Sequence, residues 1–117
     1  MDERLKILIT GATGFVGSAL TRVLRERGDC YLAAIARTAL PDSVFDDVHV
    51  VSSLADTTEL EKVVKDIDVV IHCAARVHVM NDTEADPLTV YREVNTAATL
   101  NLARQAAGFG VKRFVFI

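Results

Sequence analysis

The sequence contains only two cysteines, no apolar run long enough to cross a bilayer and no excess of positive charge. Cys30 and Cys73 lie inside apolar runs rather than in a spaced framework, so we expect reduced, buried thiols and no disulfide. Lysine and arginine are scattered and the net charge is -3, which argues against a nucleic-acid partner. The charged start, Met-Asp-Glu-Arg, lacks the apolar stretch of a signal peptide. We therefore expect a cytoplasmic protein without a membrane segment.

Strand-like and helix-like segments alternate along the chain. Half of the 117 residues are hydrophobic, which is enough for a single domain, residues 1–117, with a core of its own. Short apolar runs alternate with segments of helical period, and this alternation predicts an α/β fold with a doubly wound parallel sheet. The expected strands are residues 5–10, 31–36, 48–51, 69–73 and 113–117.

Three helices are expected between these strands, and the first two have clear end signals. The first helix is predicted over residues 14–27, with Gly28 as its C-terminal stop. Its inward positions, at i, i+3, i+4 spacing, are Val16, Leu20, Val23, Leu24 and Arg27. The second helix is predicted over residues 57–65, with Asp56 or Thr57 as its cap.

The last helix has the strongest boundary signals. Asp86 is predicted as its N-cap and Pro87 as its first residue, while Gly108 and Gly110 close the other end. Asn95 shares a stripe of this helix with apolar or aromatic residues, namely Tyr91, Val94, Ala98 and Leu102. A buried amide costs free energy unless it is hydrogen-bonded, so a helix-to-sheet hydrogen bond is one explanation of Asn95.

Three glycines stand where the first predicted strand meets the first helix, in the stretch TGATGFVG. Such a strand, turn and helix present free backbone N–H groups and a positive helix end, which together suit a phosphate. A side chain at Gly11 would obstruct the turn, one at Gly14 would block a pyrophosphate, and one at Gly17 would push the helix off the sheet. A purely structural turn is the alternative. The residues predicted to form the phosphate-binding turn are Gly11, Thr13, Gly14, Phe15, Val16 and Gly17.

The spacing Gly-x-x-Gly-x-x-Gly, with VVIHCAA at 69–75 and YREVNTAATLNLARQAAGFGVKRFVFI at 91–117, resembles the extended short-chain dehydrogenase/reductase family. The resemblance covers essentially the whole chain. It implies a Rossmann-like fold with strand order 3-2-1-4-5, truncated after the fifth strand, and an NAD(P)-binding role. The family includes nucleotide-sugar epimerases, dehydratases and reductases. The stretch HCAARVHVMND looks most like bacterial members that act on UDP-hexoses or UDP-N-acetylhexosamines in surface polysaccharide synthesis.

The end of the second strand decides between NAD and NADP. An NAD site has a carboxylate there for the ribose hydroxyls, whereas Arg37 follows this strand and can bind the extra phosphate of NADP. Arg37 could equally be a solvated loop residue. At the end of the third strand, Ser53 and then Leu54 stand where family members often have an aspartate near the adenine. The resemblance places Ala74 and Ala75 beside the cofactor ribose, where small side chains leave room.

A metal site is the rival interpretation of the fourth strand, because His72, Cys73 and His78 are all potential ligands. His72 and Cys73 are neighbours on a strand, so their side chains must point to opposite faces of the sheet. No ligand pair has zinc-like spacing. We therefore expect buried strand residues beside the cofactor and no metal.

Catalytic residues of the family are missing from the chain. The resemblance implies a Ser or Thr after the fifth strand and a Tyr-x-x-x-Lys pair, but Tyr31 and Tyr91 are followed four residues later by Ile35 and Asn95. It also implies that Asn95 supports catalysis by organising the active-site end of its helix. We therefore expect the N-terminal cofactor-binding part of a longer, homodimeric enzyme that transfers hydride at a sugar carbon. A non-catalytic, redox-sensing NAD(P)-binding module is the alternative.

Overall fold

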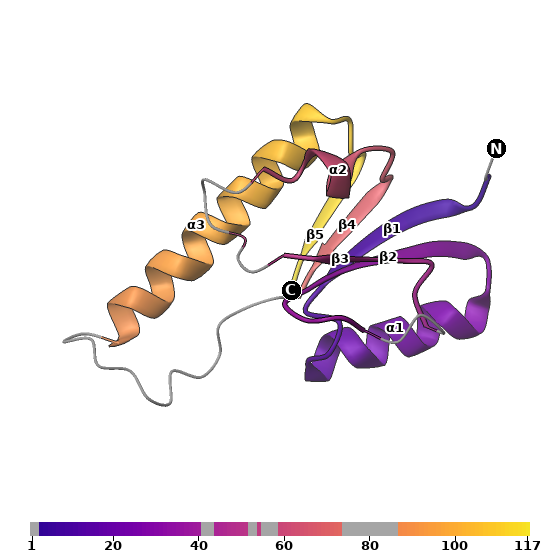
Figure 1. The fold of residues 1–117 in the computed structure, drawn as a ribbon, viewed down its shortest axis with the longest axis horizontal. Helices are drawn as coiled ribbons and strands as arrows, with labels where there is room; N and C mark the ends of the chain where they lie inside the picture. Colours follow the sequence, from indigo (N-terminus) through magenta and orange to yellow (C-terminus); the bar gives the residue numbers. More distant parts are fainter. Residues whose placement is uncertain (1–2, 41–43, 52–53, 55–58, 74–86) are drawn as a thin grey trace.

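A computed structural model describes residues 3–40, 44–51, 54, 59–73 and 87–117. Within the last of these ranges, it describes residues 87–95 by their backbone alone. Five strands form one parallel sheet in the order β3-β2-β1-β4-β5 (Figure 1). The strands are β1 (Leu5–Thr10), β2 (Cys30–Ala36), β3 (Asp47–Val50), β4 (Val69–His72) and β5 (Arg113–Phe116). The predicted strand order is confirmed, and each strand begins and ends within one residue of its prediction.

Helices cover both faces of the sheet. Helix α1 (Phe15–Arg27) lies on one face, and α2 (Glu61–Val64) and α3 (Pro87–Gly108) lie on the other (Figure 1). The central strand β1 is therefore buried on both faces, which explains its continuous apolar run. Its Leu8 packs into the core beneath α2 and α3, whereas Ile7 and Ile9 pack into the core beneath α1.

The face that α1 turns toward the sheet differs from the prediction. Gly17 and Thr21 are the buried residues of the helix. Val16 and Val23, which were expected to point inward, are 45% and 55% exposed. Gly17 lets the first turn of α1 lie directly against the backbone that follows β1. Because Gly17 and Thr21 then face inward, both valines point away from the sheet.

Helix α2 is shorter than predicted and begins later. It spans only Glu61–Val64, and its N-cap position is Leu60 rather than Asp56 or Thr57. Leu60 is fully buried, and its backbone N–H donates to Gln105 Oε1 of α3 over 2.6 Å. A hydrogen bond from another element therefore takes the place of a local side-chain cap. Residues 55–58 lie outside the described part of the chain.

Helix α3 begins at Pro87, as predicted, and ends at Gly108. Gly110 follows with a φ of +83°, a conformation that favours glycine. The backbone N–H of Val111 donates to the carbonyl of Ala106 over 2.9 Å, which satisfies one of the last carbonyls of the helix.

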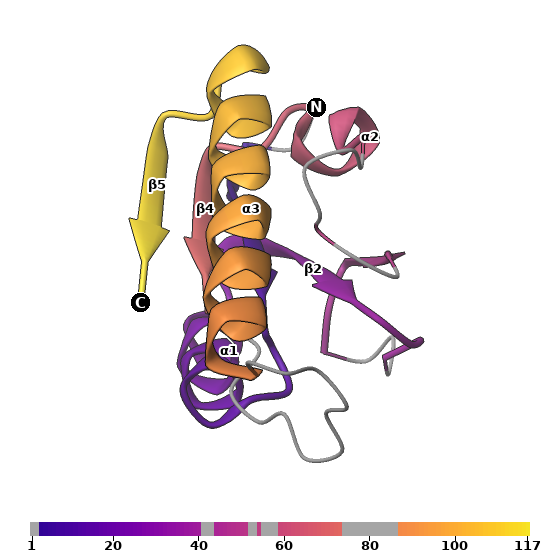
Figure 2. The same cartoon turned by 90° about the vertical axis from the view of Figure 1, so that its left-hand side faces the viewer.

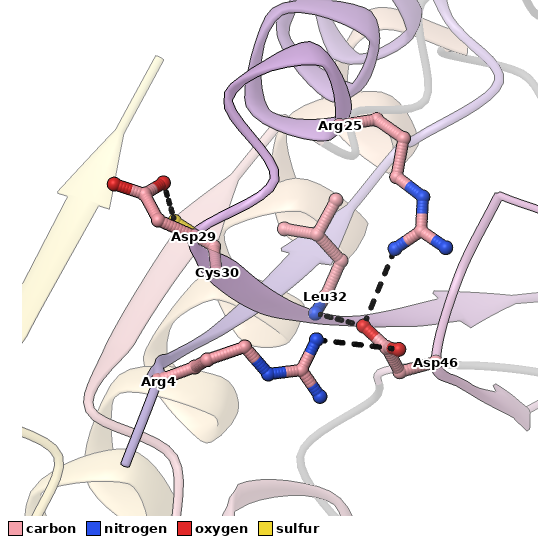
Figure 3. Close-up of polar contacts among 6 residues, drawn as sticks. All are labelled: Arg4, Arg25, Asp29, Cys30, Leu32 and Asp46. Atoms are coloured by element: carbon pink, nitrogen blue, oxygen red, sulfur yellow. Dashed lines mark hydrogen bonds and ion pairs between the residues drawn. The ribbon is translucent and has the colours of Figure 1, made fainter. Parts of the chain in front are cut away.

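Asp46, in the segment before β3, contacts both β2 and α1 (Figure 3). Its carboxylate accepts the backbone N–H of Leu32 over 2.9 Å and lies 3.5 Å from the Arg25 guanidinium and 3.8 Å from that of Arg4. Exposed ion pairs contribute little to stability, so the hydrogen bond to the backbone of Leu32 is the stronger constraint. It holds the segment before β3 against β2.

Both cysteines are free thiols, Cys30 buried and Cys73 half-buried. Burial raises the pKa of each thiol, so both stay protonated near neutral pH. The Cys30 thiol donates to the Asp29 carboxylate over 3.4 Å (Figure 3). No helix among the described residues has the length and apolar character needed to cross a membrane.

Strand β5 forms one edge of the sheet, where it pairs with β4. Val115, Phe116 and the following Ile117 are exposed. An edge with unpaired backbone groups and apolar side chains is a template for pairing with another chain.

We expect the 117-residue chain to self-associate as its concentration rises, because this edge can pair with a second copy. Light scattering should show a mass that increases with concentration, and Val115→Lys should restore a monomer by placing a charge on the edge. Phe15→Lys, which replaces an exposed apolar residue of α1 rather than of β5, is the matched control. A wild-type chain that stays monomeric at all concentrations contradicts the prediction.

Candidate functional site

The candidate site lies at the carboxyl ends of β1 and β4, where the strand order reverses. The last residue of β1, Thr10, pairs with Ile35 of β2 on one side and with His72 of β4 on the other. In open parallel sheets the ligand binds outside the strand ends at such a reversal. The glycine turn follows Thr10 directly, so the fold places it at this position.

The turn closes on Gly11. This residue has a φ of +68°, in the left-handed region that favours glycine. The N–H of Gly14 donates to the carbonyl of Gly11 over 3.1 Å, which completes the turn. A side chain at Gly11 would strain this turn, as the sequence predicted.

Gly17 is required by a close contact within the turn. A Cβ atom built at Gly17 would overlap the carbonyl oxygen of Gly11 and lie 2.7 Å from its carbonyl carbon. The atoms that this Cβ would meet belong to Gly11 and Ala12, directly after β1, rather than to a strand of the sheet. The clash is with the turn itself, so Gly17 allows the first turn of α1 to pack directly on the Gly11 peptide.

Gly14 differs from the other two glycines because the fold does not require it. Its φ of -75° and ψ of 177° are extended values that any residue adopts. A Cβ atom there would lie 3.4 Å from the Gly11 carbonyl oxygen, an ordinary van der Waals distance. The absence of a side chain at position 14 therefore leaves open space above the turn and adds nothing to packing.

The N-terminus of α1 is open to solvent. Gly14 at the N-cap provides no side-chain hydrogen bond, and the first turn contains no acidic residue. The first intrahelical bond runs from the N–H of Ser18 to the carbonyl of Gly14, so helix geometry leaves the N–H groups of residues 15–17 without an intrahelical acceptor. Phe15 is 94% exposed. These N–H groups and the positive helix end can bind an anion.

Of the other predicted site residues, Arg37, Leu54 and Thr13 lie in the described part of the chain, and the rest lie outside it. Arg37 directly follows β2 and is exposed, whereas Leu54 packs against the core beneath α2 and α3. The Leu54 carbonyl lies 3.5 Å from Nδ2 of Asn101 on α3. Thr13 is exposed in the glycine turn. Predicted residues outside the described part of the chain are Ser53, Ala74, Ala75, His78, Asp86 and the side chain of Asn95.

His72 is fully buried and uses both ring nitrogens. Its Nδ1 lies 2.7 Å from Thr10 Oγ1 and its Nε2 lies 3.0 Å from Thr99 Oγ1. Burial lowers the pKa of His72, so the ring is neutral near pH 7. His72 is the buried strand residue that was predicted, but its two threonine partners were not predicted. The available signal was the need of a buried imidazole for two hydrogen-bond partners.

The arrangement around β4 does not favour the metal interpretation. His72 contacts Thr99 of α3, whereas Cys73 packs into the core beneath α1, so the two side chains point to opposite faces as expected. No group of three histidine, cysteine, aspartate or glutamate residues among those the structure describes could hold a metal ion.

Comparison with known proteins gives the family. Residues 7–117 match the NAD dependent epimerase/dehydratase family. The chain belongs to this family. It is 49% identical over 113 residues to UDP-glucose 4-epimerase of Vibrio cholerae, covering 95% of the chain and 34% of that protein. It is 31% identical to 2-alkyl-3-oxoalkanoate reductase of Stenotrophomonas maltophilia (strain K279a), covering 96% of the chain and 32% of that protein.

A solved structure gives the same picture of the fold. MoeE5 in complex with UDP-glucuronic acid and NAD matches with a TM-score of 0.74 and 32% identity, over 95% of this chain and 36% of that one. The chain thus spans about a third of the length of the relatives it matches. Its sheet, with strand order β3-β2-β1-β4-β5, is a Rossmann-like portion of the epimerase/dehydratase fold.

The glycines at 14 and 17 should respond oppositely to alanine. Gly17→Ala must move backbone atoms of the turn and should lower the free energy of unfolding by about 3 kcal/mol. Gly14→Ala introduces only an ordinary contact and should change it by less than about 1 kcal/mol. Chemical denaturation followed by circular dichroism measures both. Equal losses in the two variants contradict the assignment of the close contact to Gly17.

Proposed function

We propose that residues 1–117 form the cofactor-binding part of a nucleotide-sugar epimerase, dehydratase or reductase that acts by hydride transfer at a sugar carbon. The uncapped N-terminus of α1 carries this proposal. It opens beside the strand-order reversal, behind a turn in which Gly14 leaves space that the fold itself does not need. Free N–H groups, a positive helix end and an approachable backbone are what a dinucleotide pyrophosphate requires.

The residues of the turn fit this cofactor. The N–H groups of Phe15, Val16 and Gly17 would hold the pyrophosphate, and Gly14 would admit it to the backbone. Thr13 and the carboxyl end of β4, with Ala74 and Ala75, would adjoin the rest of the cofactor. The bound nicotinamide supplies a hydride acceptor and donor. The chain's own contribution is to bind and orient the cofactor at the carboxyl ends of β1 and β4.

The proposed substrate is a UDP-hexose or UDP-N-acetylhexosamine. The similarity to a protein named UDP-glucose 4-epimerase and to a structure holding UDP-glucuronic acid supports this class. The reaction would oxidise the C4 hydroxyl and return the hydride, or reduce a 4-keto sugar. Acid–base residues would come from outside these 117 residues, and Asn95 would organise the adjoining end of α3. We place the complete enzyme in the cytoplasm, as a homodimer, in polysaccharide biosynthesis.

NADP is the proposed cofactor, with NAD as the alternative. Arg37 directly follows β2 and is exposed. The described residues after it, 38–40, include no carboxylate that could accept hydrogen bonds from the ribose hydroxyls of NAD. A guanidinium presents a planar set of donors that matches a phosphate.

Removing the guanidinium of Arg37 should erase the preference for NADP. Calorimetry of the wild-type chain should show tighter binding of NADP than of NAD. Arg37→Ala should cost about 1 to 3 kcal/mol of NADP binding, as expected for a charge-assisted contact, and leave NAD binding nearly unchanged. Arg22→Ala, on the exposed face of α1, is the control for a general loss of positive charge. Equal affinities for the two dinucleotides in the wild-type chain overturn the assignment of NADP.

A side chain at position 14 should block the cofactor without unfolding the protein. Gly14→Val should abolish dinucleotide binding, measured by calorimetry, while the helical circular dichroism signal stays nearly unchanged. The matched control is Gly108→Val at the end of α3, where a built Cβ atom has no atom within 4 Å apart from its chain neighbours and the adjacent helix backbone. Undiminished binding by Gly14→Val would reduce the turn to a structural feature and remove the basis of the proposed function.

A further inference from the structure

One histidine lies among the apolar side chains of the core. Among the side chains that the structure describes, the largest fully buried ones are seven aliphatic residues together with Thr10 and His72, and these two polar residues contact each other. An apolar residue of similar volume would fill the same space without the desolvation cost of an imidazole and two hydroxyls. Hydrophobic packing alone therefore does not account for this group.

The contacts of His72 converge on the candidate site. Thr10 is the last residue of β1, and the turn begins with the next residue, Gly11. Thr10 Oγ1 lies 2.7 Å from His72 Nδ1 and also accepts the backbone N–H of Cys73 over 3.1 Å. One hydroxyl thus joins the carboxyl ends of β1 and β4, the two strands between which the strand order reverses.

The other ring nitrogen of His72 reaches helix α3. Nε2 lies 3.0 Å from Thr99 Oγ1, and Thr99 follows Asn95 by one helical turn. Helix α3 runs antiparallel to β4 and β5, and its N-terminal end extends past the carboxyl ends of these strands (Figure 2). Farther along α3, Gln105 bonds to the Leu60 backbone over 2.6 Å and to Asn101 over 2.8 Å. The His72 contact thus ties α3 to the carboxyl end of β4, whereas Asn101 Nδ2 of α3 lies 3.5 Å from the carbonyl of Leu54, beyond β3.

We propose that Thr99 and His72 are positioning residues for dinucleotide binding, and that the imidazole sets α3 at a fixed distance from the glycine turn. Hydrogen bonds of defined length and direction hold both strand ends against the helix. Apolar packing by Leu102 and Ala106 also holds the helix, but it does not fix the direction of a contact at the strand ends as a hydrogen bond does. The inference rests on the proposed binding of a dinucleotide at the turn.

Thr99→Val tests this inference because it removes the hydroxyl and keeps the shape of the side chain. At a temperature where every variant is folded, it should weaken dinucleotide binding about tenfold, since Nε2 loses its buried partner. Thr99→Ser restores the hydroxyl and should restore the affinity. The imidazole ¹⁵N signals of His72 should shift when the dinucleotide saturates the wild-type chain, and this response should be smaller in Thr99→Val.

The variant Val64→Ala shows whether a loss of stability alone weakens dinucleotide binding. Val64 is a fully buried residue of α2 whose truncation destabilises the core without touching the hydrogen bonds of His72. It should lower the midpoint of thermal unfolding and leave the affinity unchanged. If Thr99→Val binds as tightly as the wild-type chain, or if Val64→Ala weakens binding equally, the positioning role is wrong and the proposed function stands. If the wild-type chain binds neither NAD nor NADP, both are overturned.

Discussion

The contact between Gly17 and the Gly11 peptide is the constraint on which the candidate site depends. Because no Cβ atom fits between them, α1 starts directly against the turn that follows β1. This contact turns Gly17 and Thr21 toward the sheet and leaves Val16 and Val23 outside. It also aims the uncapped N-terminus of the helix past the end of the central strand. One missing side chain thus determines both the rotation of the helix and the direction of its free N–H groups.

The two faces of the sheet are held by different interactions. On one face, α1 approaches the backbone closely through small residues, with Leu20 and Leu24 against the core. On the other face, α3 combines apolar packing by Leu102 and Ala106 with hydrogen bonds to His72, Leu54 and Leu60. Close backbone packing suits a turn that must admit a ligand to its main chain. Directional hydrogen bonds suit a helix that must keep its position beside that turn.

The sequence predicted the features that depend on local chemistry. Two-sided burial produces unbroken apolar runs, so the strand positions followed from the pattern, as did the tight turn at Gly11 and the start of α3 at Pro87. The strand order followed from the family resemblance. Features that depend on distant partners were missed. Helix α2 begins where Gln105 binds Leu60, and His72 finds its partners 62 and 27 residues away. The roles assigned to Ser53, Ala74, Ala75 and Asn95 remain predictions.

The central claim is that a dinucleotide pyrophosphate binds the free N–H groups at the start of α1. A titration of the ¹⁵N-labelled chain with NADP, followed by amide chemical shifts, tests it most directly, since each N–H group reports separately. The account predicts that the largest shifts occur at Phe15, Val16 and Gly17, because anions bind at such helix ends. Saturable binding that leaves these three amides unchanged would contradict it.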